Sequence, residues 1–157
     1  MLSRNNSGMA MLEFLLAGIP LLLFLMTLLQ LSLLWIDKGT VDTAAHFAAR
    51  KLARTARVDF SSAKQEAFLE AWRTCKDRPD GSFADAAMTT LDITRDGERK
   101  ADRVTAGDAL CVRLTHGVEL IVPWVDRILY LLSPGPKAHI GNRYYLLMQS
   151  TRWVTVE

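Results

Sequence analysis

The sequence predicts an α+β fold, in which one long N-terminal helix crosses a membrane and then continues into a small domain with a short antiparallel sheet. Three features support this: a long uncharged apolar run near the N-terminus, a helical pattern of small residues after it, and stretches of alternating polar and apolar residues later in the chain. The 157 residues leave room for one domain and one membrane segment. We expect a transmembrane helix over 9–36, its extension over 37–57 and an α+β domain over 58–157.

The apolar run extends from Phe14 to Ile36 and holds 23 residues without a charge. A helix of this length spans about 35 Å, and the hydrocarbon layer of a bilayer is about 30 Å thick. A cleaved secretory signal would have a shorter apolar region, about 7 to 15 residues, followed by a small-x-small site, which WIDKGTV does not offer. We therefore expect a retained transmembrane helix. Pro20 removes one helical hydrogen bond and predicts a kink or a loosened turn.

Glu13 is a carboxylate inside the apolar stretch that begins at Met9. One interpretation is a helix-start carboxylate at the membrane interface, where the helix dipole favours a negative charge. The other interpretation needs a cation. If the chain is cut between Gly8 and Met9, the new amine of Met9 lies one helical turn from Glu13. The residues alone leave both interpretations open.

The segment SGMAMLEF, which contains Gly8, Met9 and Glu13, resembles the processing site of type IV prepilin-like proteins. Phe14 after the glutamate, the downstream Pro20 and the alanine-rich stretch AAHFAARKLA make the resemblance more specific. Together they resemble the TadE family of minor pilin-like proteins, or pseudopilins, in tight-adherence (Flp) pilus systems. The resemblance covers residues 7 to about 54.

This resemblance implies a pilin-like layout, removal of a leader over 1–8 by a prepilin peptidase, and a role in pilus assembly and adhesion. Glu13 and Phe14 would serve assembly, with Glu13 neutralising the amine of Met9. The implied partners are the major pilin, other minor pilin-like subunits, the prepilin peptidase, the inner-membrane assembly platform and the lipid bilayer.

Membrane orientation follows from the resemblance and not from charge. Arg4 and the initial amine precede the apolar run, while Lys38, Arg50 and Lys51 follow it, so the positive-inside rule does not choose. Prepilin peptidases cut on the cytoplasmic face. The resemblance therefore implies a bacterial inner-membrane protein with a cytoplasmic N-terminus and a periplasmic domain, which could reach the extracellular pilus after assembly.

Both cysteines, Cys75 and Cys111, lie in the part expected to be periplasmic, where a disulfide is permitted. We expect this bridge. It would close a loop of 36 residues and restrict the unfolded chain by about 3 to 4 kcal/mol. Two buried thiols are the alternative.

Several function classes have little support in the sequence. The 19 Lys and Arg against 17 Asp and Glu give no nucleic-acid signature. His46, His116 and His139 are scattered and the cysteines form no CxxC pair, so we expect no metal and no cofactor. Phosphate-binding loops and nucleophile elbows are also missing. We expect no enzyme. The alternatives are an uncleaved single-pass envelope scaffold or binding protein and, with less support, a membrane-anchored periplasmic enzyme.

The helix over 37–57 carries a face of small side chains, suited to close packing within the subunit or between subunits. A capping box of Ser62 and Gln65 predicts a second helix as far as Cys75. The remaining expected elements are strands at 89–93, 109–116 and 144–156, a hairpin turn at Asp96-Gly97, a helix over 119–133 with Pro123 in its first turn, and loops at 76–87 and 133–142.

Overall fold

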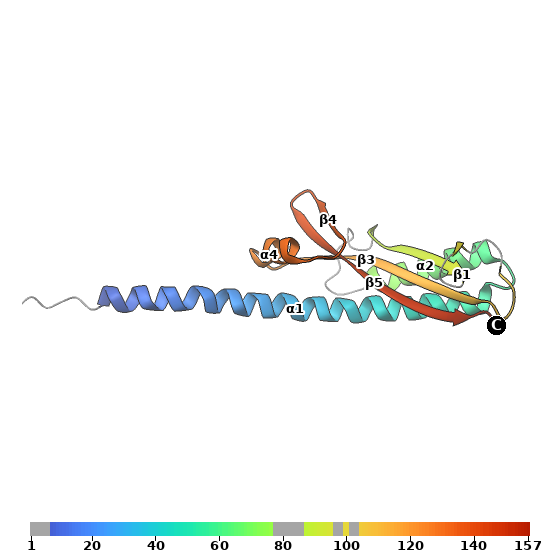
Figure 1. Ribbon diagram of the computed structural model, residues 1–157, viewed down its shortest axis with the longest axis horizontal. Helices are drawn as coiled ribbons and strands as arrows, with labels where there is room; N and C mark the ends of the chain where they lie inside the picture. Colours follow the sequence, from blue (N-terminus) through green and yellow to red (C-terminus); the bar gives the residue numbers. More distant parts are fainter. Residues whose placement is uncertain (1–6, 77–86, 96–98, 101–103) are drawn as a thin grey trace, which may run out of the picture.

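The computed structural model describes residues 7–76, 87–95, 99–100 and 104–157. It has the predicted α+β fold: the long helix α1 (Ser7–Thr55) carries, at its C-terminal end, a small domain with an antiparallel sheet (Figure 1). The other described elements are α2 (Phe60–Lys76), β1 (Thr90–Arg95), β2 (Arg99–Lys100), β3 (Ala109–Glu119), α4 (Val125–Leu132), β4 (Lys137–Ile140) and β5 (Arg143–Thr155). The N-terminal half of α1 projects from the domain as a rod.

The sheet has five strands in the order β2-β1-β3-β5-β4. Its centre is the long antiparallel pair of β3 and β5, which stay in register from Ala109 opposite Thr155 to Glu119 opposite Tyr145. Both strands are long enough to extend past the part that covers α1 and α2. Figure 1 shows this far end, with β4 and α4, lying beside the middle of α1. The long pair of β3 and β5 thus brings residues late in the sequence next to the apolar part of α1.

The core lies between the C-terminal half of α1, the helix α2 and one face of the sheet. Small side chains form the contact between the helices, with Ala44, Ala45 and Ala48 of α1 and Ala67 and Ala71 of α2 all fully buried. Alanine lets two helix backbones approach closely. The alanine face, for which packing within or between subunits was open, is therefore buried within its own chain.

The predicted start of the second helix was wrong by three residues. Asp59 caps α2: its carboxylate accepts the Ser61 N–H at 2.9 Å and the Ser62 hydroxyl at 2.6 Å. The hydrogen bonds from Ser62 and Ser61 hold the pKa of Asp59 below its ordinary value. An aspartate at this position satisfies otherwise unbonded N–H groups of the first turn, so Ser62 lies inside the helix.

The predicted helix over 119–133 was too long. Strand β3 continues to Glu119, because that residue pairs with Tyr145 of β5, and α4 begins only at Val125. Trp124 has a φ of 71°, which interrupts any helical path from Pro123. The expected loop over 133–142 contains β4. The predicted turn at Asp96-Gly97 and most of the loop over 76–87 lie outside the described residues.

Candidate functional site: the exposed half of helix α1

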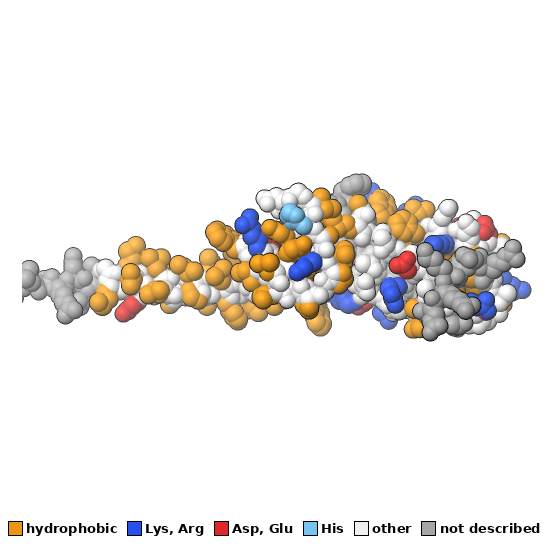
Figure 2. Space-filling view, turned by 45° about the horizontal axis from the view of Figure 1, so that its top comes forward, with side chains coloured by type: hydrophobic (Ala, Val, Ile, Leu, Met, Phe, Trp, Pro, Cys, Tyr) orange, Lys and Arg blue, Asp and Glu red, His pale blue; other side chains and the backbone are white. Residues whose placement is uncertain are grey.

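The N-terminal half of α1 is apolar and exposed. Most of its large apolar side chains between Met9 and Ile36 expose from 38% to 83% of their surface, and they cover the projecting rod in Figure 2. Within the described residues, α1 is the one helix long and apolar enough to cross a membrane, and none of its most apolar window is buried. A core helix of a water-soluble protein would be buried. These properties fit a single-pass membrane protein.

The predicted processing site lies at the start of this rod. Gly8 and Met9 are exposed, and a Cβ added to Gly8 would meet no atom within 4 Å. Met9 and Glu13 are four residues apart and so share one face of the helix. No ion pair to Glu13 occurs among the described residues. Phe14 is 75% exposed. In the part of the chain that the structure describes, none of these four residues is thus buried in the fold.

The helix is continuous through Pro20, so the missing N–H does not end it. The kink itself stays a prediction. Two hydroxyls further along bond to the helix backbone: Thr27 donates to the Leu23 carbonyl at 2.7 Å and Ser32 to the Leu28 carbonyl at 2.9 Å. In a membrane these polar groups are thereby satisfied within their own helix.

Gln30 is fully buried, although it lies inside the expected membrane segment. Its side-chain oxygen accepts the backbone N–H groups of Ile121 at 3.1 Å and Val122 at 2.8 Å, in the connection between β3 and α4. Its partners are 91 and 92 positions away and belong to the backbone, so no side-chain pattern could have revealed them.

A second link joins α1 to the sheet directly after the apolar run. The ammonium of Lys38 lies 3.0 Å from the Asp42 carboxylate and donates to the Gln149 carbonyl of β5 at 2.7 Å. The hydrogen bond from Ser150, also on β5, holds the pKa of Asp42 below its ordinary value, and Lys38 acts in the same direction. Gln30, Lys38 and Asp42 together fix the sheet against α1 at the border of the apolar segment.

The structure does not contain the predicted disulfide. No bridge joins Cys75 and Cys111, and both are buried. Cys75 packs in the core cluster with Leu110 and Val112, the two neighbours of Cys111 on β3. Successive side chains of a strand point to opposite faces, so Cys111 points away from the core face. The two sulfurs therefore lie on opposite sides of β3. The spacing of the cysteines in the sequence does not reveal which side each one occupies.

Three basic side chains of α1, Arg50, Lys51 and Arg54, line a shallow hollow of about 340 Å³ together with Phe47 and Glu70. Lys51 also pairs with Glu66 of α2 at 3.2 Å. Both partners are nearly half exposed, and such pairs contribute little to stability. We find no converging groups for catalysis in this hollow.

The three histidines stay apart. His116 is buried and lies 2.9 Å from the Thr89 hydroxyl, while His139 stacks beside Tyr144. In the part of the chain that the structure describes, no group of three or more His, Cys, Asp or Glu side chains is placed to hold a metal ion.

One comparison with known proteins gave a match: residues 8–50 match the family model described as TadE-like protein. The match begins at the predicted processing glycine and covers the exposed half of α1 and most of its alanine face. Over this segment it confirms the resemblance to the TadE family that was read from the sequence. Neither the curated proteins nor the solved structures with which the chain was compared gave a match.

Proposed function

We propose that this TadE-like protein is a minor pilin-like subunit, or pseudopilin, that prepilin peptidase cleaves after Gly8 and that takes part in assembling a tight-adherence pilus and in adhesion. The observation that carries the proposal is an apolar half-helix that its own domain leaves uncovered and that lies within the matched segment. In this role the chain acts through assembly and not through catalysis, with no cofactor.

Cleavage after Gly8 is supported by access. The peptide bond between Gly8 and Met9 lies on the exposed rod, remote from the sheet and from α2. The Cα of Gly8 has open space around it. A peptidase could therefore reach the site without unfolding the domain, provided that the first turn of α1 unwinds locally.

Cleavage after Gly8 would give Glu13 a cationic partner. The new amine of Met9 would lie one turn away, and their opposite charges would compensate each other once both leave the water interface. The same compensation could occur between Glu13 of one subunit and Met9 of the next. An unpaired carboxylate in the apolar interior of a filament would be costly, so this pairing would favour cleaved subunits.

The apolar half of α1 would supply the packing. In the membrane its leucine and phenylalanine side chains contact lipid, and in a filament they would contact the same helices of the major pilin and of other minor pilin-like subunits. We assign the N-terminus to the cytoplasm and the domain to the periplasm, because prepilin peptidases cut on the cytoplasmic face. The inner-membrane assembly platform would then act on the membrane-embedded form.

The test is the N-terminus of the mature protein. In cells that contain the peptidase, mass spectrometry should find Met9 as the first residue of the wild-type chain. Gly8→Ala should retain the leader, because the peptidase reads the glycine. Gly18→Ala is the matched control: that glycine is also in α1 and also has open space around it, so the variant should be cleaved normally. An intact leader on the wild-type chain would refute processing and favour the uncleaved envelope scaffold.

Glu13→Gln separates cleavage from assembly. The variant should be cleaved, since the glycine is intact, but its pili should be few or absent because the Met9 amine has lost its counter-charge. Asp92→Asn is the control, a loss of one exposed carboxylate on β1, and should leave pili unchanged. Normal piliation by Glu13→Gln would rule out the charge pair.

A further inference from the structure

Helix α4 and two residues that precede it, Ile121 and Trp124, expose an apolar surface. The side chains are Ile121, Trp124, Ile128, Leu131 and Leu132, with exposed fractions of 52%, 78%, 47%, 76% and 74%. Within α4, Ile128, Leu131 and Leu132 are three and four residues apart and so lie on one side of the helix. We call these five residues the α4 patch. A water-soluble domain rarely gathers so many large apolar side chains on one short exposed helix.

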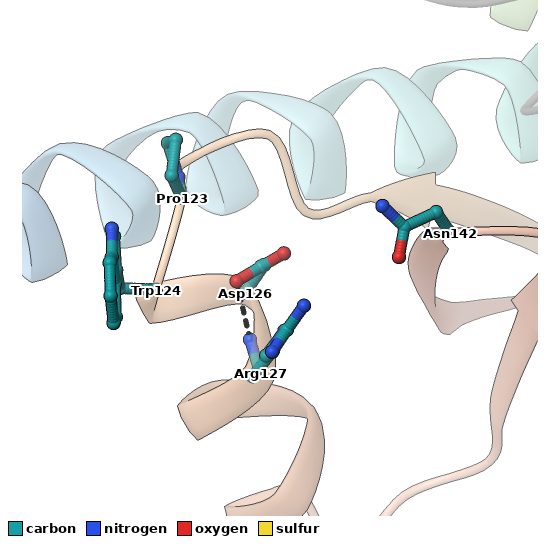
Figure 3. A pocket seen from close by; sticks show the side chains of 5 residues that line it. All are labelled: Pro123, Trp124, Asp126, Arg127 and Asn142. Atoms are coloured by element: carbon teal, nitrogen blue, oxygen red, sulfur yellow. Dashed lines mark hydrogen bonds between the residues drawn. The ribbon is translucent and has the colours of Figure 1, made fainter.

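The opposite side of α4 is polar. Asp126 and Tyr130 occupy it, Val125 turns inward and is buried against the domain, and Arg127, four residues before Leu131, lies at the border of the patch. In Figure 3, Trp124 lies toward the N-terminal part of α1, whereas Asn142 lies on the far side of the hollow that these residues line. The helix therefore has an apolar face with Arg127 at its border and a polar face on the other side, as interfacial helices with basic flanks do.

The Gln30 hydrogen bonds fix the height of this patch along α1. Gln30 lies six positions before Ile36, or about 9 Å before the end of the apolar run in an upright helix. The run, about 35 Å long, exceeds the hydrocarbon thickness of about 30 Å by only a few ångströms. The connection held by Gln30 thus lies a few ångströms below the edge of the hydrocarbon layer. Interfacial helices insert their apolar face by about 5 to 10 Å.

The backbone N–H groups leading into α4 are hydrogen-bonded within the protein, as a position inside the membrane requires. Leu120 donates its N–H to the Tyr144 carbonyl at 2.9 Å, Ile121 and Val122 donate theirs to Gln30, and Pro123 has no N–H to donate. Four consecutive positions of non-helical chain therefore present no free donor. Irregular backbone at membrane depth is stable only when its polar groups are satisfied by protein or by water.

We propose that the α4 patch is a second membrane contact, in which α4 lies in the leaflet on the domain side of the bilayer and Gln30 holds it at that depth. The occupant of the patch is the lipid boundary and not a protein. The argument is continuity: the patch adjoins the exposed apolar surface of α1, which contacts lipid in a single-pass protein. Trp124 next to that boundary matches the preference of tryptophan for membrane interfaces.

This contact holds whether or not Gly8 is cleaved, so it is independent of the proposed function. It would fix the domain close to the membrane with a set tilt relative to α1. Extraction of the subunit would then have to remove α4 from the lipid as well as α1. The contact would also retain the subunit at the membrane until assembly begins.

The test measures the depth of single tryptophans in the full chain. Trp35→Phe, Trp72→Phe and Trp153→Phe together leave Trp124 as the reporter; in two matched proteins, Trp35 or Trp153 remains instead. Each protein is placed, one chain per disc, in nanodiscs of lipids with or without brominated acyl chains. Circular dichroism checks that all three keep the fold. Bromine quenches tryptophan only at close contact, so Trp124 should lose emission as Trp35 does, while Trp153 on β5 should not.

Two outcomes would overturn the proposal. Trp124 emission could be the same in brominated and ordinary lipid, which places α4 in water. Alternatively, Trp124 could become shielded only when several chains share a disc, which would assign the patch to contact with a second copy. Leu131→Glu with Leu132→Glu provides a second check: it should reduce the quenching of Trp124. The control Val58→Glu, at an exposed valine remote from the membrane half, should not.

Discussion

Helix α1 has two halves that share one continuous backbone and have opposite environments. Between Met9 and Ile36 most of the large leucine, methionine and phenylalanine side chains are exposed. Between Val41 and Ala56 a stripe of mostly alanine side chains is buried against α2 and the sheet. Side-chain size rather than helix propensity separates the two halves, because alanine and leucine are both good helix formers.

Each half of α1 is suited to a different kind of packing partner. An alanine stripe fits a fixed neighbour at short distance, since it lets backbones approach and leaves no freedom of side-chain rotamer to lose. A leucine surface needs no fixed neighbour, because lipid tails and other leucine-rich helices surround it equally well. One helix can therefore be rigid in its own domain and still exchange partners along its other half.

The most direct test of the difference between the two halves is to remove the same atoms from a leucine in each. Leu52 is fully buried in the core, so Leu52→Ala should lower the free energy of unfolding of the domain by about 2 to 5 kcal/mol. Leu22 is 56% exposed on the rod. Leu22→Ala should change domain stability by no more than about 0.5 kcal/mol.

Chemical denaturation in detergent micelles, followed by tryptophan fluorescence, measures both variants. Equal destabilisation by Leu52→Ala and Leu22→Ala would show that the two halves of α1 unfold as one unit with the domain, contrary to the division drawn above.

The reverse change tests the alanine stripe. Ala45 is fully buried in the core that α1 forms with α2 and the sheet, and Ala45→Leu should destabilise the domain by about 1 to 3 kcal/mol, because the extra atoms force the packed elements apart. The control is Ala17→Leu, on the exposed half, which should leave the denaturation midpoint unchanged. A neutral Ala45→Leu would mean that the α1 and α2 contact has room for a larger side chain.

Gln30 lies where the comparison is least clear, since it is buried in a half that is otherwise exposed. Gln30→Leu leaves the N–H groups of Ile121 and Val122 without their acceptor, at a cost of about 1 to 3 kcal/mol for each unsatisfied buried group. Amide hydrogen exchange at those two residues should therefore become faster. Gln65→Leu, at an exposed glutamine of α2, should not alter it. Unchanged exchange in Gln30→Leu would show that another group holds the connection.

The sequence predicted the features that depend on local pattern. The uncharged run predicted the helix to Ile36, the alternation from Ala109 predicted β3, and the motif around Gly8 and Glu13 predicted the family model that matches residues 8–50. It did not predict contacts that depend on which face or which distant segment meets: the bond of Gln30 to the connection before α4, and the separation of the two cysteines on different sides of β3.

The predicted ends of helices and strands were wrong for a related reason. The capping box of Ser62 and Gln65 favoured Ser62 as the helix cap, and nothing in the local sequence favoured Asp59, three residues earlier, over it. Glu119 looked helical from its downstream neighbours, but pairing with Tyr145 kept it in β3. Such competition between a local signal and a distant partner is decided by the tertiary structure.

The smallest expected effect concerns Asp42, at the junction of the two halves. Its folded pKa lies below the ordinary value of 3.8, mainly because Ser150 donates a hydrogen bond to it, with Lys38 adding to the effect. The unfolded state therefore binds the proton more readily than the folded state. The stabilisation is fully present above about pH 4 and is lost as the pH falls through the folded pKa. Since the carboxylate is 37% exposed, the contribution is at most about 1 kcal/mol.

Asp42→Asn should accordingly lower domain stability slightly at pH 7, and the difference from the wild-type chain should narrow as the pH falls below about 4. Denaturant midpoints measured across this pH range test the expectation. Asp92→Asn, at an exposed carboxylate of β1, should show no such pH-dependent difference. If the loss in Asp42→Asn stayed constant down to the lowest pH, the asparagine would be acting through packing against β5, and the link between the membrane half and the sheet would not depend on charge.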